Sequence, residues 1–188
     1  HKTNQVIAPM EFGYMYQPYF VIKDQREADP DRRYKMAFLS IQRNVTDRET
    51  TTHPGTRRGT GIAFSPDGLH WNRVKDFASD ELIDISHFMI DPYRDGEFVI
   101  YGRTLRVMPE IREAWQHYDW FESIYRGRAV IRSTSRNFLE WEPAEFIMGP
   151  DLKDPPSTEI YSMNVFPYEG IYLGLVQRYL CRPDTSTI

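Results

Sequence analysis

The sequence predicts an all-β fold built from repeated four-stranded antiparallel sheets, and three observations support this. Two tryptophan turns, Ser65–Trp71 (SPDGLHW) and Ser135–Trp141 (SRNFLEW), lie 70 positions apart, and each follows an apolar-polar stretch. The chain is rich in aromatic residues, with 12 Tyr, 11 Phe and 4 Trp, and these favour strands. Short apolar runs alternate with turns rich in Pro, Gly and Asp.

The first repeat, residues 14–76, is predicted to be a four-stranded meander. Its strands are expected at 17–23, 33–41, 59–64 and 70–74. Asp67-Gly68 is a tight hairpin turn before the fourth strand, because the Asp-Gly pair suits the positive φ that such turns need. The polar stretch 42–58 is predicted to be a long exposed loop.

The second repeat, residues 80–146, follows the same plan. Its strands are expected at 86–90, 97–103, 127–133 and 140–142. The connector 104–126 is predicted to contain a short helix around Pro109–Tyr118. The third repeat, residues 157–188, contains two strands only, at 161–167 and 171–179.

Four-stranded meanders repeated around an axis are the blades of a β-propeller, which closes with about four to eight blades. Two and a half blades cannot close a ring, and an open apolar edge is a liability. We therefore expect residues 1–188 to be a single partial propeller domain, with the remaining blades supplied by missing sequence or by a partner chain. The alternative is a two-sheet sandwich whose turns are similar by coincidence.

Composition and charge exclude several classes of function. The net charge of -4 argues against nucleic acid or an anionic membrane as a partner, and no apolar run approaches the ~20 residues of a membrane span. Cys181 is the sole cysteine, and the five histidines lack the spacing of metal ligands. No phosphate-binding loop is present. We therefore expect neither a metal nor a cofactor.

The candidate active site lies where the first strand of each repeat begins. Asp24, Asp91 and Phe166 mark the turns that follow the first strands. Counting back seven residues from each reaches Gln17, Asp84 and Glu159, which equivalent geometry would aim at one axial pocket. Two converging carboxylates are the arrangement that glycoside hydrolysis requires. The alternatives are that Asp84 caps a strand start and that Glu159 is a solvated loop charge.

Other side chains near these positions are candidates for binding substrate. His87 and Tyr161 could form hydrogen bonds with sugar hydroxyls, although a histidine satisfied within the core is the alternative. Arg103 and Arg178 end second strands and could brace the carboxylates. Trp115 and Trp120 could stack on a sugar ring or simply pack in the connector.

Several of these motifs resemble a known group of enzymes. Asp84–Pro92, Glu97–Tyr101 and the first tryptophan turn look like parts of blades in the five-bladed propellers of glycoside hydrolase families 32 and 43. The segment 128–179 resembles uncharacterised bacterial relatives of that superfamily. The resemblance implies a complete propeller of five blades that hydrolyses glycosidic bonds in an oligo- or polysaccharide, in a bacterial protein for which a secreted or periplasmic location is favoured.

The resemblance also implies roles for the axial residues. Those families use an aspartate in the first blade, a second aspartate that orients the site and a glutamate that acts as general acid. Asp84 matches the second and Glu159 the third, but Gln17 stands at the first position, and an amide is neither a nucleophile nor a base. Either an absent blade or Asp24 supplies the missing acid, or the protein binds sugar without cleaving it.

Two other functions remain open at this point. The first is a non-catalytic carbohydrate-binding or scaffold propeller, in which Gln17 marks lost chemistry. The second takes Ser65–Trp71 as a degenerate aspartate box of the sialidase type, which should be accompanied by an arginine triad.

Overall fold

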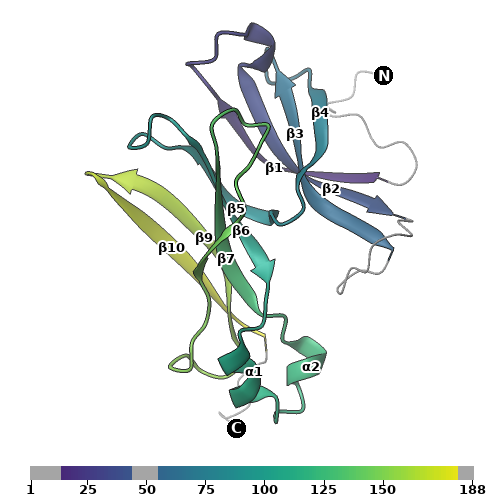
Figure 1. Cartoon of the computed structure of the whole chain (residues 1–188), viewed down its shortest axis with the longest axis vertical. Coiled ribbons are helices and arrows are strands. Elements are labelled where there is room, and N and C mark those ends of the chain that lie inside the picture. The colour runs from purple at the N-terminus through teal and green to yellow at the C-terminus, as the bar shows by residue number, and fades with distance from the viewer. Residues whose placement is uncertain (1–13, 44–54, 182–188) are drawn as a thin grey trace.

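The chain folds mainly into strands, which confirms the predicted all-β class. The computed structural model describes residues 14–43 and 55–181, and these form three antiparallel sheets. The sheets follow one another along the chain (Figure 1), and in each of them every strand pairs with its neighbour in sequence. Three separate sheets exclude the two-sheet sandwich. Closure into a five-bladed ring stays a prediction.

The elements have the following bounds. The first sheet contains β1 (Tyr14–Lys23), β2 (Tyr34–Arg43), β3 (Thr56–Ser65) and β4 (Asn72–Ser79). The second contains β5 (Ile83–Ile90), β6 (Phe98–Leu105), β7 (Arg128–Ser135) and β8 (Glu145–Met148). The third contains β9 (Thr158–Tyr168) and β10 (Ile171–Leu180).

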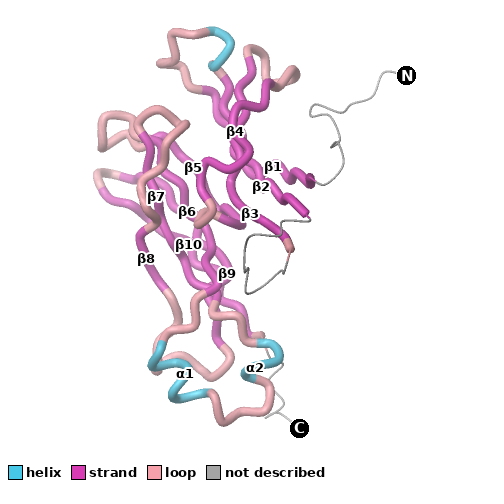
Figure 2. Tube along the Cα trace, turned by 45° about the vertical axis from the view of Figure 1, so that its right-hand side comes forward, coloured by secondary structure: helices cyan, strands magenta, loops and turns pink. Residues whose placement is uncertain are grey.

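Within residues 14–43 and 55–181, helical structure occurs in two connections. A 3-10 turn, Pro30–Arg32, lies between β1 and β2, and helices α1 (Pro109–Trp115) and α2 (Phe121–Ile124) lie between β6 and β7. The helix predicted near Pro109 is therefore present, and it is followed by a second helix. Figure 2 shows both helices together at one end of the molecule. None of the helices in the described ranges has the length and apolar character to cross a bilayer.

The two tryptophan turns share one pattern of hydrogen bonds, so the sequence repeat is also a structural repeat. The carboxylate of Asp67 accepts hydrogen bonds from the N–H groups two and three residues later, both at 2.8 Å. The side chain of Asn137 accepts the equivalent pair, both at 2.9 Å. The next residue has a positive φ in each turn, 79° at Gly68 and 66° at Phe138. Because each turn extends through its tryptophan, the fourth strands begin later than predicted.

The core lies between neighbouring sheets. Between the first and second sheets it consists of Ala37, Ile62, Phe64, Leu82, Phe88, Phe98, Ile100, Ile131 and Phe138. Between the second sheet and β9 it consists of Met89, Val99, Tyr101, Val130, Ile160, Met163 and Val165. Side chains alternate across a strand, so the second sheet buries one set on each face. The first strands of the three sheets are neighbours, with β1 against β5 and β5 against β9.

The two tryptophans occupy equivalent faces of successive sheets. Trp141 packs against the core between the first and second sheets, as expected for a residue between blades. Trp71 packs with Met36, Phe38 and Ala63, which alternate with the residues facing the second sheet. Trp71 therefore covers the face of the first sheet that is turned away from the second sheet.

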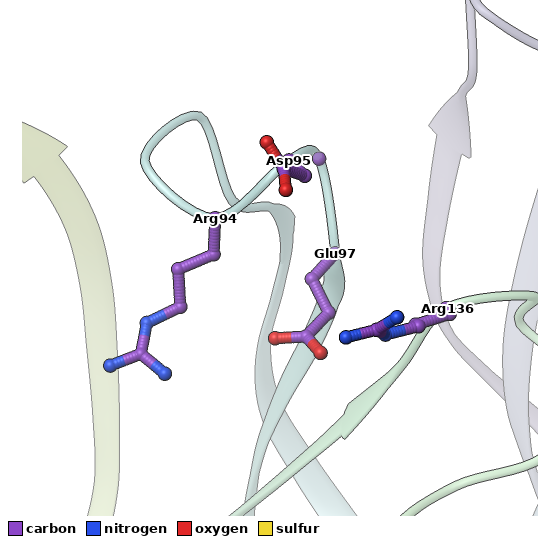
Figure 3. Close-up of a pocket in the computed structure, with 5 residues that line it drawn as sticks. Arg94, Asp95, Glu97 and Arg136 are labelled. Carbon is purple, nitrogen blue, oxygen red and sulfur yellow. The ribbon is translucent and has the colours of Figure 1, made fainter.

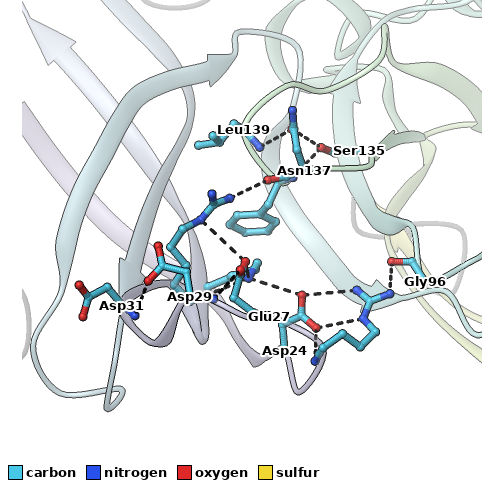
Figure 4. A network of polar contacts seen from close by, with 12 residues as sticks. Asp24, Glu27, Asp29, Asp31, Gly96, Ser135, Asn137 and Leu139 are labelled. Atoms are coloured by element: carbon cyan, nitrogen blue, oxygen red, sulfur yellow. Dashed lines mark hydrogen bonds and ion pairs between the residues drawn. The ribbon is translucent and has the colours of Figure 1, made fainter.

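A buried ion cluster around Asp24 and Glu27 joins the β1–β2 connection to the second sheet at Gly96 (Figure 4). The Nζ of Lys35, a residue only 1% exposed, lies 3.4 Å from Asp24 and 2.9 Å from Glu27. Arg26 donates to Asp24 at 3.0 Å and to the carbonyl oxygen of Gly96 at 2.7 Å. Asp24 is thus buried and paired at the far end of β1. It does not supply the missing axial acid.

This cluster predicts a loss of stability in acid. Burial alone would raise the pKa of Asp24 and of Glu27, but hydrogen bonds from Arg26 and Lys35 and the charge of Lys35 outweigh it. Both pKa values therefore lie below their ordinary 3.8 and 4.5. A lowered pKa stabilises the fold at pH values above the unfolded pKa, and this stabilisation disappears as the pH falls through the folded pKa. We therefore expect the midpoint temperature of thermal unfolding to decrease once the pH is lowered beneath about 4.

Thermal unfolding followed by circular dichroism, at a series of pH values from neutral to acid, measures this loss of stability. The double variant with Asp24→Asn and Glu27→Gln serves as the comparison, since its curve should depend less steeply on pH. Equal acid sensitivity of the two proteins would show that other carboxyl groups are responsible.

The outer face of the third sheet is open. All ten residues of β10 are exposed, among them Leu175 at 64% and Tyr172 at 39%. One edge of β10 pairs with β9, and within the described residues no strand pairs with the other edge. A long apolar edge is a template for further pairing. That further strands cover it, from this chain or a partner, stays a prediction.

Candidate functional site

The candidate site lies at the end of the sheets where β5, β7 and β9 begin and where β6 and β10 end. Asp84 and Glu159 are each the second residue of a strand, β5 and β9 respectively. The connection that carries α1 and α2 leaves and re-enters the second sheet at this same end (Figure 1). The topology therefore brings the two predicted carboxylates to one end of adjacent strands.

Asp84 is a partly exposed carboxylate in an unfavourable backbone conformation. Its φ is 50°, and β5 pairs irregularly with β6 between Ile83 and His87. Arg103 donates to Asp84 in close contact, and the Tyr19 hydroxyl donates to Asp84 Oδ1 at 3.3 Å. The side chain of Asp84 remains 26% exposed. Left-handed backbone at a residue other than glycine is costly and often marks a functional position.

The hydroxyl of Tyr19 completes the surroundings of Asp84. It also accepts a hydrogen bond from the backbone N–H of Asp84 at 2.9 Å. Burial, with the nearby charge of Asp84, raises the pKa of Tyr19 above its ordinary value, so the hydroxyl keeps its proton. Tyr19 therefore fixes both the backbone and the side chain of Asp84.

Glu159 is fully buried, and donors reach both of its oxygens. The guanidinium group of Arg128 binds Oε2 in close contact. The backbone N–H groups of Arg126 and Arg128 donate to Oε1 at 2.7 and 3.2 Å. Gly127 has a φ of 67°, and a Cβ there would lie 2.5 Å from the backbone nitrogen of Val107. Only glycine fits this position, where it allows both flanking N–H groups to point at Glu159.

Tyr161 connects the two carboxylates through their arginines. The guanidinium carbon of Arg103 lies 4.5 Å from the centre of the Tyr161 ring, and that of Arg128 lies 5.8 Å from it. The ring of Tyr179 lies 5.9 Å from that of Tyr161, centre to centre. Tyr161 and Tyr179 are 40% and 42% exposed. The candidate site is therefore a continuous row of ionic and cation–π contacts with exposed aromatic rings.

Sequence reasoning missed Arg58 and Arg128, although the repeat contains a signal for them. The two residues are 70 positions apart, the same spacing as the tryptophan turns. Each lies near the start of the third strand of its sheet and reaches the acid of the next sheet: Arg58 Nη2 lies 3.8 Å from Asp84, and Arg128 binds Glu159. Applying the repeat length to arginines would have found this pair.

The other predicted residues have different surroundings. His87 lies opposite Tyr101, its ring is edge-on to Phe20, and burial lowers its pKa. Arg178 Nη1 lies 4.0 Å from Asp154. The pairing register of β9 and β10 shifts between Gln177 and Arg178, and the arginine bound to Glu159 is Arg128. That Arg178 braces an axial carboxylate stays a prediction. That His87 and Arg178 bind substrate stays a prediction.

The remaining predictions concern Gln17 and the two tryptophans of the connector. Gln17 lies in β1 opposite Leu39, and its side chain is outside the described part of the structure. Trp115 and Trp120 are 4% and 6% exposed and pack with Ile111, Phe121 and Tyr125. Packing of the connector, rather than stacking on a sugar, is therefore the role of both tryptophans.

A hollow of about 590 Å³ lies at the opposite end of β5 and contains none of the predicted site residues. Arg94, Asp95, Gly96, Glu97 and Arg136 line it. Figure 3 shows Glu97 and Arg136 pointing toward one another across it. Within residues 14–43 and 55–181, His, Cys, Asp and Glu form no group of three or more that could hold a metal ion.

Among solved structures, the chain is similar to an N-acetylgalactosamine deacetylase from F. plautii, determined in complex with blood group B trisaccharide. The TM-score is 0.51 and the sequence identity 12%. The match covers 95% of this chain and 49% of that chain, so this chain spans about half the length of its neighbour. The similarity shows the fold, and it does not single out families 32 and 43. No protein-family model and no curated protein matches the sequence.

Proposed function

We propose that this protein binds carbohydrate, and that Asp84 is the carboxylate that contacts the sugar. The observation that carries the proposal is the state of Asp84: a partly exposed carboxylate, held by Arg103 and Tyr19 in a left-handed backbone conformation. Such strain persists only where the surroundings fix it, and it clusters at functional sites.

The surroundings of Asp84 suit a sugar. Carboxylates and guanidinium groups bind hydroxyls through charge-assisted hydrogen bonds, and exposed aromatic rings offer apolar contact to a pyranose. Asp84, Arg103, Tyr161 and Tyr179 provide these groups within one row of contacts. The neighbour with a shared fold acts on N-acetylgalactosamine, and this supports carbohydrate as the class of ligand.

Hydrolysis of a glycosidic bond is the second candidate, favoured by the position of Asp84 and Glu159 at one end of adjacent strands. The reaction needs two carboxyl groups about 5 to 9.5 Å apart, one of which donates a proton to the leaving oxygen. Glu159 is inaccessible while Arg128 and two N–H groups surround it. It would act as an acid only after Arg128 moves away, so we rank binding through Asp84 first.

Replacing Asp84 with asparagine tests the proposal. Asparagine tolerates a positive φ and has nearly the same shape, so the fold should remain, but the charge that binds hydroxyls is lost. We expect the affinity for the bound oligosaccharide to fall about tenfold or more, measured by titration calorimetry against neutral and acidic oligosaccharides. Asp95→Asn is the matched control, because Asp95 also has a positive φ, 48°, but lies at the opposite end of β5.

The two candidates separate in a hydrolysis assay. If the protein releases reducing ends, Glu159→Gln should abolish that release while oligosaccharide binding persists. Binding without release in the unmodified protein would exclude hydrolysis and leave the binding function. Equal affinities of the Asp84→Asn and Asp95→Asn variants would remove Asp84 from the site.

A further inference from the structure

Among the residues that the structure describes, the candidate site holds more guanidinium groups than carboxylates. Two acids pair with three arginines there: Asp84 with Arg58 and Arg103, and Glu159 with Arg128. The chain as a whole carries a net charge of -4, so this positive excess is local. Partly buried cations without a full complement of anions are unfavourable, and a ligand anion would relieve the imbalance.

Comparison of the two equivalent arginines identifies the one in excess. Arg128 binds Glu159 in close contact, and among the described residues that acid has no second side-chain ion pair. Arg58 Nη2 lies 3.8 Å from Asp84, an acid that Arg103 already occupies. Among the described residues, the Nε of Arg58 has no hydrogen-bond partner. Its side chain is 22% exposed, so solvent and ligands can reach it.

Unpartnered donors point to the same place. Buried side-chain atoms without a hydrogen-bond partner in the described ranges include the Nε atoms of Arg58, Arg103 and Arg128. They also include the hydroxyl of Ser40, which lies opposite Gly59, the residue after Arg58 in β3. Buried polar groups normally have partners, and these four donors are available to acceptors such as water or a ligand.

We infer that the ligand is an acidic glycan, one that contains a uronic acid, and that Arg58 binds its carboxylate. A planar guanidinium group matches a carboxylate through two parallel hydrogen bonds, which a neutral sugar cannot form. Asp84 then accepts hydrogen bonds from hydroxyls of the same or the next sugar, because its negative charge repels the carboxylate of the uronic acid. The inference rests on the proposed function, which it narrows to a class of sugar.

Titration calorimetry of the whole chain with trigalacturonic acid, and with galactotriose as its neutral counterpart, tests the inference. We expect the acidic trisaccharide to bind more tightly, with an affinity that weakens as salt is added. Arg58→Gln should lower that affinity about tenfold or more and weaken the binding of the neutral sugar far less. Arg58→Lys keeps the charge but not the planar guanidinium group. Its affinity for trigalacturonic acid should lie between those of the unmodified protein and of Arg58→Gln.

Arg57→Gln is the matched control. Arg57 is the adjacent residue of β3, and its side chain pairs with Asp80 at 3.0 Å rather than with Asp84. The Arg57→Gln substitution should change the affinity for trigalacturonic acid by less than about twofold. Galactotriose bound as tightly as trigalacturonic acid would overturn the acidic-glycan inference and leave the proposed function standing. Binding of neither, in a panel with sulfated and other neutral oligosaccharides also unbound, would overturn both.

Discussion

Replacing Lys35 with methionine is expected to lower the free energy of unfolding by about 3 kcal/mol or more. Lys35 is 1% exposed and lies between Asp24 and Glu27 and over the rings of Phe64 and Phe98. Methionine fills much of the same volume, so the change chiefly removes the charge. Two carboxylates are then left with less compensation in a buried place, and an uncompensated buried charge is strongly destabilising.

Urea unfolding measures the effect through the transition midpoint, with the slope as a check that the two-state description holds. Lys75→Met is the matched control. Lys75 donates to the carbonyl oxygen of Leu139 at 3.2 Å, also across the two sheets but on an exposed surface. We expect it to cost less than about 1 kcal/mol. Arg32 Nε also lies 3.8 Å from Glu27. A similar small cost for Lys35→Met would show that Arg26 and Arg32 alone compensate the two acids.

The strands could be predicted from the sequence because their signals are local. Alternating apolar residues and side-chain capped turns act over a few residues, and the tryptophan turns at Ser65–Trp71 and Ser135–Trp141 form the same hydrogen bonds in the structure. The repeat also placed Asp84 and Glu159 at equivalent positions, each the second residue of its strand. Local pattern and repeat length together thus locate the end of the sheets that holds the candidate site.

The partners of these acids could not be predicted in the same way, because they depend on contacts between sheets. Arg128 reaches Glu159 from a different sheet, across 31 positions of sequence. The pairing of β9 and β10 shifts register at Arg178, whose Nη1 lies 4.0 Å from Asp154. Register shifts change which side chains meet, and their positions are not encoded in the alternation of apolar residues.

Phe138→Ala is the second variant with a large expected effect. Phe138 is 0% exposed and contacts the rings of Phe64, Phe88, Phe98 and Trp141, with centres 5.2 to 5.9 Å away. Its truncation leaves a cavity between the first and second sheets, and such changes cost about 3 to 5 kcal/mol. Urea unfolding measures the loss. A cost below about 1 kcal/mol would show that the sheets collapse to fill the space.

Phe138→Gly separates packing from backbone strain at the same position. Glycine is normally less stable than alanine by about 1 kcal/mol within regular structure, but at a φ of 66° alanine bears a penalty that glycine escapes. We therefore expect the glycine variant to be at least as stable as the alanine variant. The repeat provides the reciprocal control, Gly68→Ala, at the equivalent position with a φ of 79°.

A Cβ at Gly68 would meet the ring of Tyr34 at an ordinary 3.5 Å, so any cost of Gly68→Ala comes from the backbone. We expect it to be about 1 to 2 kcal/mol. If alanine proves more stable than glycine at position 138 while Gly68→Ala is destabilising, the two turns do not share one backbone conformation. Agreement of both comparisons would instead establish that the second repeat keeps a strained turn in order to bury Phe138 between the sheets.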